Sequence, residues 1–492
     1  MTGSKRNSTG QIFKASAILG GASAVSMIAG IIKNKVVAVL LGPESIGFIG
    51  LLQSVMNTAG TISGLGLASS GVRQIAEAQA NGDEKCVAET RNALLWSSVI
   101  LGLLGAMLLV ILRKPIAGLV LGHDGYAGAI AWVAAGVWAS TVSGVQTSIL
   151  NGLRRLGDLA RAYVLGALGG MLLTVPAVWQ WGEKGITVAV ISTPLALLTA
   201  SWWYNLKIPA TGFKFSREDI LKPLRGLLGL GLAFMSTNLI RLVNQLVVRV
   251  VITRTLGLVA TGYFQAAWSI SMLYLGFVLD ALGKDFYPRL SAVAKERDTT
   301  NRMVNEQIKV VLLLAGPVIL GMLTLTPQVV NTIYSGAFKE TIGILQWQVI
   351  GDLFKVASWP MGFILVAQGH SRLVFIMELS WNLMFLGFVC GGLPVWNLKA
   401  TGVAYFATHI LHFCLLWIIV FRINHFVYRK KNLILLALLL GCAAIVTLAR
   451  FLPGIFPLAL GLTVTATVGG FSLVSISRSL GGLPWEKGTR RT

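Results

Sequence analysis

The chain has 492 residues, of which 55% are hydrophobic and only 12% are charged, and its formal net charge is +22. About a quarter of the residues in an ordinary soluble domain are charged, so this composition excludes a string of soluble globular domains. The apolar residues also come in runs of about 20, the length that crosses a bilayer as a helix. The sequence therefore predicts a polytopic membrane protein of the all-α class.

Fourteen transmembrane helices are predicted from the apolar runs, with ends good to a few residues. In chain order they span roughly 13–41, 46–67, 92–112, 127–150, 162–180, 185–206, 224–253, 258–282, 307–326, 345–367, 373–393, 401–423, 432–450 and 455–477. Pro43 lies between the first two runs and marks a break, because a proline removes one helical hydrogen bond and clashes with the preceding turn. The connecting loops are too short to hold a separate recognition domain.

Positive charge sorts these loops by side. If the N-terminus is cytoplasmic, most of the 41 Lys and Arg residues fall in the N-terminal segment, in the loops on the same side and in the C-terminal tail. Cytoplasmic loops of membrane proteins carry an excess of Lys and Arg, so both termini are predicted to be cytoplasmic. Ordinary loop charge thus accounts for most of the net charge, and no nucleic-acid partner is expected.

The chain also repeats. Leu41-Gly42 recurs as Leu256-Gly257, 215 residues later, and further short matches follow at nearly the same offset. Two halves of six helices each have the same orientation, which makes this a parallel repeat. The predicted organisation is an N-terminal six-helix lobe (1–206), a cytoplasmic linker (207–222), a C-terminal six-helix lobe (223–423), and two extra transmembrane helices with a cytoplasmic tail (424–492).

Charged and polar residues inside the predicted spans are the main candidates for function. Each central charge costs about 2.5–3.5 kcal/mol on insertion scales, so such residues normally face a wet cavity or a partner. On the span 224–253, Asn238, Arg241, Gln245 and Arg249 are spaced by three or four residues. This spacing places all four on one face of the helix.

The first span carries a matching polar stripe that ends at Lys33, with Lys35 close by. Because the spans 13–41 and 224–253 are repeat counterparts, both stripes are expected to line the cleft between the halves and to bind substrate. The alternative is interhelical hydrogen bonding, with Lys and Arg side chains that snorkel toward the outer surface. This alternative carries most weight for Lys35.

A third group of candidates lies on the span 345–367. Asp352, Lys355 and Trp359 stand at positions i, i+3 and i+7, just before Pro360. They are predicted to line the substrate cavity, and Asp352 is also a candidate proton or ion relay. The alternative is a purely structural Asp–Lys pair within the helix.

Glu378, in the span 373–393, is the second candidate for a proton or ion relay, because a carboxylate inside a membrane helix is rarely without a function. Asn382 stands one helical turn away from it. The alternative is that Glu378 forms an ion pair with a neighbouring basic residue such as Arg372 or Arg161.

Amide and aromatic side chains on the second and eighth spans suit a sugar, because rings stack on its C–H faces and amides bond its hydroxyls. The candidates are Asn57, Gln265 and Trp268. Ordinary helix packing is the alternative, and it is slightly favoured.

Signatures of metal binding and catalysis are absent from the sequence. His409 and His412 lack carboxylate or cysteine companions, and the four cysteines have no metal-ligand spacing. No nucleophile-elbow, phosphate-loop or zinc-protease motif is present. No metal, no cofactor and no enzymatic activity are therefore expected.

Four stretches resemble a known family: LLGPESIGFIGLLQS (40–54), RQIAEA (73–78), FYPRLSAVA (286–294) and GDLFKVASWPMGFILVAQG (351–369). The chain is similar over these stretches to the bacterial O-antigen and exopolysaccharide lipid-carrier flippases, which are polysaccharide biosynthesis proteins of the multidrug/oligosaccharidyl-lipid/polysaccharide exporter superfamily. The resemblance extends from the first helix to the twelfth, and the last stretch is the most telling.

This resemblance implies two six-helix lobes around a central cavity, in the bacterial inner membrane. It implies that a polyprenyl-diphosphate-linked oligosaccharide repeat unit moves from the cytoplasmic to the periplasmic leaflet by alternating access. The predicted cationic stripes fit its anionic head group. Besides this glycan lipid and the bilayer, a polysaccharide polymerase and a chain-length regulator are the partners to expect.

Three other functions remain open. A drug or metabolite antiporter of the same superfamily is one, although an exporter of cations would need an acidic cavity, whereas cations outnumber acids inside these spans. A peptidoglycan-precursor flippase is the second, because it too has fourteen helices and a cationic cavity. A non-transporting scaffold in a polysaccharide assembly complex is the third, and it would leave the buried cations without a purpose.

Overall fold

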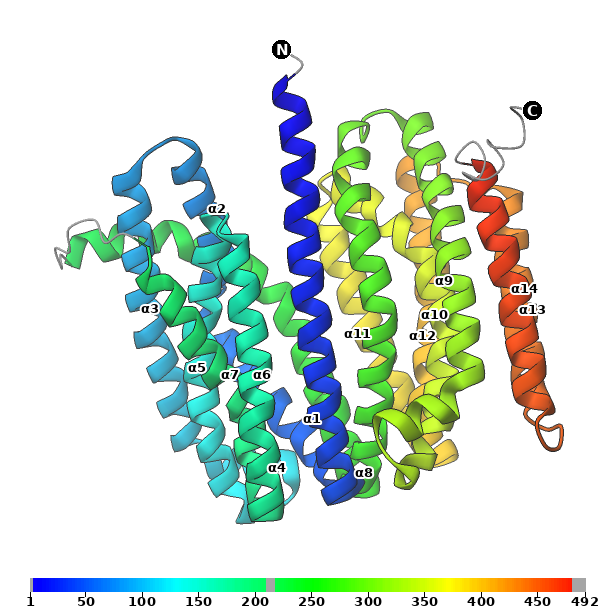
Figure 1. The fold of residues 1–492 in the computed structure, drawn as a ribbon, viewed down its shortest axis with the longest axis horizontal. Helices are drawn as coiled ribbons and strands as arrows, with labels where there is room; N and C mark the ends of the chain where they lie inside the picture. The colour runs from blue at the N-terminus through cyan, green and yellow to red at the C-terminus, as the bar shows by residue number, and fades with distance from the viewer. Residues whose placement is uncertain (1–2, 209–216, 480–492) are drawn as a thin grey trace, which may run out of the picture. The chain divides into compact units, whose positions relative to one another are not determined.

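The computed structural model describes the backbone of residues 3–208 and 217–479, and side chains from residue 18 onward except at 217–230, 233, 234, 277, 278, 280, 281 and 284. These stretches are helical, and no strand occurs in them (Figure 1). The helices are α1 (Gly3–Gly64), α2 (Leu67–Ala80), α3 (Glu84–Ile111), α4 (Arg113–Leu121), α5 (Ala127–Gly152), α6 (Leu156–Trp181), α7 (Ile186–Leu206), α8 (Arg217–Ala292), α9 (Arg297–Ile333), α10 (Lys339–Ala367), α11 (Ser371–Trp396), α12 (Ala400–Asn424), α13 (Lys430–Ala449) and α14 (Phe456–Ser479).

Two of the helices are broken at a glycine. The break in α1 lies at Gly42, with φ 76° and ψ −169°, and the break in α8 lies at Gly257, with φ 88° and ψ 172°. Glycine reaches positive φ without the steric cost of a Cβ atom. The breaks fall at the predicted separations between the first and second spans and between the seventh and eighth. The two broken positions are also the glycines that correspond to each other in the sequence repeat.

The repeat is also visible in the lengths and positions of two later helices. Helices α6 and α11 have 26 residues each, and they begin and end 215 positions apart. The residues that follow them, Gly182 (φ 56°, ψ −128°) and Asn397 (φ 47°, ψ −139°), take nearly the same unusual backbone conformation. Sequence similarity at these positions is weak, so the repeat is clearer in the backbone than in the side chains.

Ten stretches of the described residues are long and apolar enough to cross a membrane. Four of them have 42 to 54 residues, about twice the length that one crossing needs. These are Ile18–Gly64, Leu156–Leu206, Met235–Gly276 and Ser371–Asn424. Each contains one of the four backbone breaks described above. The protein is therefore a polytopic all-α membrane protein, and the count of fourteen crossings stays a prediction.

Some predicted loops are helical instead. Helices α2 and α4 lie in the predicted loops 68–91 and 113–126, and α3 begins at Glu84, where the Asp83 carboxylate accepts a hydrogen bond from the Cys86 amide. Neither helix contains an apolar run of membrane-spanning length, because α2 and α4 are short and α2 buries only one face. That face, including Leu67 and Ile75, packs into a core cluster with residues of α3 and α5.

The chain folds into two compact units. Unit 1 is Met1–Gly262 with Ile333–Ser335, and unit 2 is Tyr263–Thr332 with Gly336–Thr492. The predicted division at 206, 222 and 423 stays a prediction. Part of the predicted linker, 209–216, and the end of the predicted tail, 480–492, lie outside the described residues.

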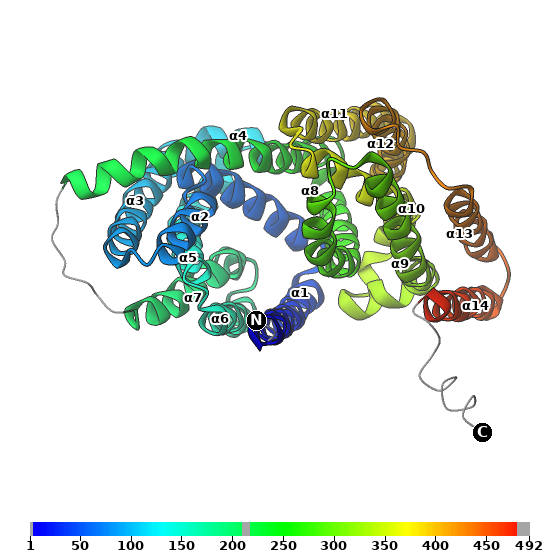
Figure 2. The same ribbon diagram turned by 90° about the horizontal axis from the view of Figure 1, so that it is seen from above.

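Each unit has its own packed helices. In unit 1, α3 packs on α5, α5 on α7, and α7 on α6, and these helices run side by side in both views (Figures 1 and 2). Their core includes Leu150, Ala162 and Tyr204. In unit 2, α12 packs on α10 and α11, and α13 packs on α14. This packing determines which helix faces remain available for a site.

Candidate functional site

The candidate site is a cavity of about 470 Å³ inside unit 1. Its walls come from the end of α1, the beginning of α2, the middle of α5 and the part of α8 near Arg241. Amide and hydroxyl side chains line it, including Asn57 and Ser140. Among the described residues, Arg241 is the only charged side chain that lines it.

Arg241 is held by a neighbour on its own helix. One terminal nitrogen of its guanidinium donates a hydrogen bond to Oδ1 of Asn238 at 2.8 Å. Both side chains belong to the cavity wall, and Arg241 is exposed there. A guanidinium has five donors in a planar fork that fits a phosphate or carboxylate. The Asn238 contact orients the fork and leaves donors for an anionic ligand.

Glycines give the cavity its shape. Gly66 has φ 69°, and a Cβ atom added there would collide with the carbonyl oxygen of Gly231. A Cβ at Gly60 would lie 3.1 Å from Oγ of Ser140. At Gly66 two backbones lie close together, and at Gly60 the Ser140 hydroxyl lies against the helix; a missing side chain permits both approaches. The wall between α1, α5 and α8 therefore depends on small residues.

The other stripe cations lie apart from this cavity. The Nζ of Lys33 donates to Oγ1 of Thr193 at 3.0 Å and to the carbonyl oxygen of Ala189 at 3.4 Å, both on α7. Lys35 donates to the carbonyl oxygen of Tyr334. The structure therefore gives these two lysines protein acceptors, on α7 for Lys33 and just after α9 for Lys35, and neither lines the cavity around Arg241.

Arg249 is buried, with 4% of its surface exposed, and donates to the carbonyl oxygen of Gln245 at 3.0 Å. Gln245 and Arg249 continue the face that carries Asn238 and Arg241, yet neither lines the cavity. The helix face is shared as predicted, but only its first half opens onto the cavity.

Unit 2 contains a buried cluster centred on Asp352. This carboxylate is fully buried and accepts hydrogen bonds from the hydroxyls of Tyr274 at 2.5 Å and Tyr405 at 2.8 Å. Ser271 lies at 3.4 Å and Nζ of Lys355 at 3.8 Å from its oxygens. The Asp–Lys pair within the helix is thus present, and it is embedded in a larger hydroxyl network.

Glu378 lies on α11 and accepts a hydrogen bond from Nδ2 of Asn382 at 3.2 Å. Arg161, one of the two basic partners considered for it, instead lies 3.4 Å from Asp158 in unit 1. The four-residue spacing of Glu378 and Asn382 along α11 brings the two side chains into contact.

The aromatic and amide candidates of unit 2 are packed. Trp268 is 7% exposed and lies against the rings of Phe385 and Tyr405. Nε2 of Gln265 donates to Ser269 on its own helix at 3.2 Å. These contacts agree with the packing alternative.

Trp359 also packs within unit 2. Its ring lies 4.8 Å from that of Phe363 and 6.5 Å from that of Phe286, measured between centroids. The indole is only partly buried. In this structure Trp359 belongs to an aromatic cluster.

Three residues that sequence reasoning did not select belong to the Asp352 cluster. Tyr274 and Tyr405 bond the carboxylate, and the ring of His409 lies 4.4 Å from that of Tyr405. Neither imidazole nitrogen of the buried His409 has a hydrogen-bond partner among the described residues. The one available signal was the four-residue spacing of Tyr405 and His409, which places both on one face of α12.

Comparison with known proteins identifies the family of the chain and solved structures of similar fold. Residues 36–343 match the family described as "Polysaccharide biosynthesis protein". The chain is 22% identical over 406 residues to the "Lipid III flippase" of Escherichia coli (strain K12), covering 82% of this chain and 96% of that protein. It is also 22% identical over 321 residues to the "Succinoglycan biosynthesis transport protein ExoT" of Rhizobium meliloti (strain 1021), covering 65% and 60% respectively.

Among solved structures, the chain is similar to the "Lipid II flippase MurJ, inward closed conformation". The TM-score is 0.73 and the sequence identity 15%, with 94% of this chain and 100% of that chain covered. At this identity the similarity demonstrates a shared fold.

Proposed function

The chain belongs to the polysaccharide biosynthesis protein family, and from this premise we propose that it is a transporter that flips a lipid-linked saccharide across a membrane. The proposed substrate is a polyprenyl-diphosphate-linked oligosaccharide repeat unit, of the O-antigen or exopolysaccharide type. It moves from the cytoplasmic to the periplasmic leaflet of the bacterial inner membrane by alternating access. The names of the two relatives, a flippase and a biosynthesis transport protein, support this class.

The cavity around Arg241 is the observation that carries the proposal. A diphosphate diester has about two negative charges, and charge-assisted hydrogen bonds from a guanidinium to phosphate are among the stronger ones in proteins. The amides of Asn57 and Asn238, with the hydroxyls nearby, supply donors and acceptors for sugar hydroxyls. An acidic drug-export cavity would need carboxylates, and none lines this cavity in the described chain.

The proposed orientation places the cavity where loading would occur. If both termini are cytoplasmic, α5 runs toward the cytoplasm, and its cavity-lining residues at 140–145 lie in its cytoplasmic half. The head group would enter from that side, while the polyprenyl tail stays in the bilayer.

The membrane potential favours export of such an anion. At 100 mV, inside negative, each negative charge moved outward gains about 2.3 kcal/mol, so two charges gain roughly 4–5 kcal/mol. The buried Asp352 with its tyrosines, and Glu378, are proposed as proton or ion relays that add to this driving force. Lys33, Lys35 and Arg249 are proposed as later contacts, because an anion could replace the carbonyl groups they now bond.

Reconstituted vesicles test the function. Purified protein would be placed in liposomes with a fluorescent polyprenyl-diphosphate oligosaccharide, and its transfer between leaflets would be followed by enzymatic accessibility. Arg241→Ala is expected to slow transfer by about 10- to 100-fold, because it removes charged hydrogen bonds to phosphate.

Arg73→Ala is the matched control. Arg73 is an exposed arginine of α2 in the same unit, 2.7 Å from Glu77, and it lies outside the cavity. Its removal should leave transfer unchanged. Equal transfer rates in both variants and the unchanged protein would refute the role of the cavity, and no transfer of any lipid-linked glycan by the unchanged protein would refute the function.

A further inference from the structure

A second cavity in unit 1 lies on another side of α5. It has a volume of about 580 Å³ and is lined by α3, α5 and α7. Helix α5 contributes Trp138, Val142 and Gln146 to it, spaced four residues apart, whereas the cavity around Arg241 uses other residues of α5. The two cavities share no lining residue, so the proposed transport site does not account for the second cavity.

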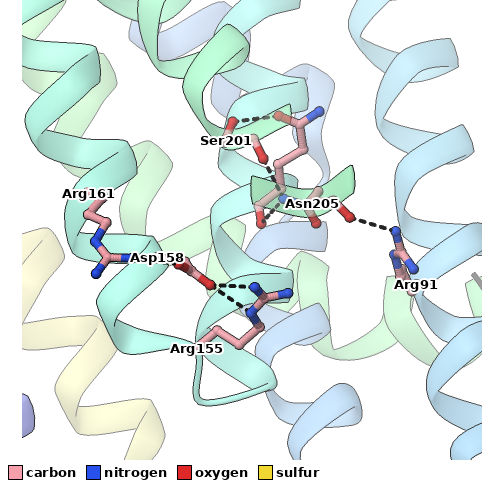
Figure 3. Close-up of polar contacts among 7 residues, drawn as sticks. Arg91, Arg155, Asp158, Arg161, Ser201 and Asn205 are labelled. Carbon is pink, nitrogen blue, oxygen red and sulfur yellow. Dashed lines mark hydrogen bonds and ion pairs between the residues drawn. The ribbon is translucent and has the colours of Figure 1, made fainter. Parts of the chain in front are cut away.

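One end of this cavity is polar, and hydrogen bonds assemble it. A terminal nitrogen of Arg91 donates to the carbonyl oxygen of Asn205 at 3.0 Å, and Nδ2 of Asn205 donates to the carbonyl oxygen of Gln146 at 3.1 Å. Figure 3 shows Arg91 directed at Asn205, with Arg155 paired to Asp158 nearby. Arg155 adds positive potential at Arg91.

The rest of the cavity is apolar. From Arg91, the wall continues along α3 through Leu95 to Val99, and opposite them stand Trp138 and Val142. Eight residues of helix rise by roughly 12 Å. The cavity therefore has a cationic end and an apolar body deep enough for a length of acyl chain.

Two buried polar atoms along the wall lack partners within the described chain. The indole Nε1 of Trp138 has no acceptor, and Oδ1 of Asn205, a residue with 5% exposure, has no donor. A buried polar group without a hydrogen-bond partner is unfavourable, because it has lost its contact with water and gained nothing in return. A ligand with oxygen acceptors and a hydroxyl donor beside an apolar chain would satisfy both.

We propose that this cavity binds a resident anionic glycerophospholipid of the cytoplasmic leaflet. Its phosphate lies at Arg91, a head-group hydroxyl donates to Asn205, an ester oxygen accepts from Trp138, and one acyl chain fills the apolar body. Arg91 is the single charged lining residue of the described chain, which matches the single negative charge of such a lipid. Because α5 separates it from Arg241, the lipid is a bound structural partner and is not transported.

Native mass spectrometry of the full chain tests the proposal. The protein would be released from nanodiscs that contain equal amounts of phosphatidylglycerol and phosphatidylcholine. The unchanged protein is expected to retain phosphatidylglycerol with about tenfold preference, from the charged contact to phosphate. Equal retention of both lipids would overturn the assignment, and so would preferential retention of polyprenyl phosphate when it is added to the same nanodiscs.

Variants locate the lipid. Arg91→Gln should remove the preference, and Val99→Trp, which fills the apolar body, should lower retention of both lipids. Arg73→Gln should retain the preference, and so should Arg241→Ala, which separates this site from the transport cavity. Unchanged retention in the folded fraction of either cavity variant would contradict the proposal.

Discussion

Arg241 and Asp352 both lie in stretches that are long and apolar enough to cross a membrane, yet their surroundings differ. Arg241 is exposed in an open cavity of unit 1, where its guanidinium donates a hydrogen bond to Asn238 on the same helix. Asp352 is fully buried in unit 2 and accepts hydrogen bonds from Tyr274 and Tyr405. An exposed cation is available to a ligand at little structural cost, whereas a satisfied buried anion stabilises its own unit first.

The largest effect is expected for Asp352→Ala. The substitution removes the buried acceptor of two tyrosine hydroxyls and the carboxylate beside the Lys355 ammonium. Removing one partner of such a network destabilises a protein by about 3–5 kcal/mol. The free energy of unfolding would be measured by titration with sodium dodecyl sulfate in mixed micelles. A loss below about 1 kcal/mol would mean that the cluster is not structural.

Tyr405→Phe should weaken the same cluster less. It removes a hydroxyl that donates to Asp352 at 2.8 Å and lies 3.3 Å from Nζ of Lys355. The expected loss is about 1–2 kcal/mol in the same titration. Tyr287→Phe, at an exposed ring of the same unit, is the control and should change nothing measurable.

Arg241→Lys, unlike the two substitutions in the Asp352 cluster, should impair transport without lowering stability. The charge remains, but an ammonium cannot reproduce the planar fork or its orientation by Asn238. Transfer of the lipid-linked glycan should fall by about fivefold, roughly 1 kcal/mol, while the unfolding titration stays unchanged. If Arg241→Lys lowered stability as much as Tyr405→Phe, the Arg241 cavity would not differ from the Asp352 cluster in the way described.

Glu378→Gln is expected to have the smallest effect. The amide keeps a polar contact with Asn382 but cannot carry a proton, so transfer should slow by about twofold to threefold, and only when a proton gradient is imposed. The measurement compares transfer in vesicles with and without that gradient. The same response to the gradient in variant and unchanged protein would remove the relay role.

The sequence by itself determined the features that depend on neighbours along one helix. Apolar runs define helices because every backbone polar group must be satisfied inside the bilayer. Gly42 and Gly257 mark breaks because other residues are strained at positive φ. Spacing of three or four residues likewise produced the contacts of Arg241 with Asn238, of Lys355 with Asp352, and of Glu378 with Asn382.

Only the tertiary structure decided which helix each face meets. Lys33 and Arg241 lie on similar stripes, yet Lys33 meets carbonyl and hydroxyl groups of α7 while Arg241 faces a cavity. Tyr405 reaches Asp352 from 53 positions away. Helical periodicity gives the direction of a side chain about its own axis, but not the neighbour packed there. That neighbour depends on the small residues that let particular helices approach. It decides whether a charged side chain is available to a ligand, as at Arg241, or is held within the core of its unit, as at Asp352.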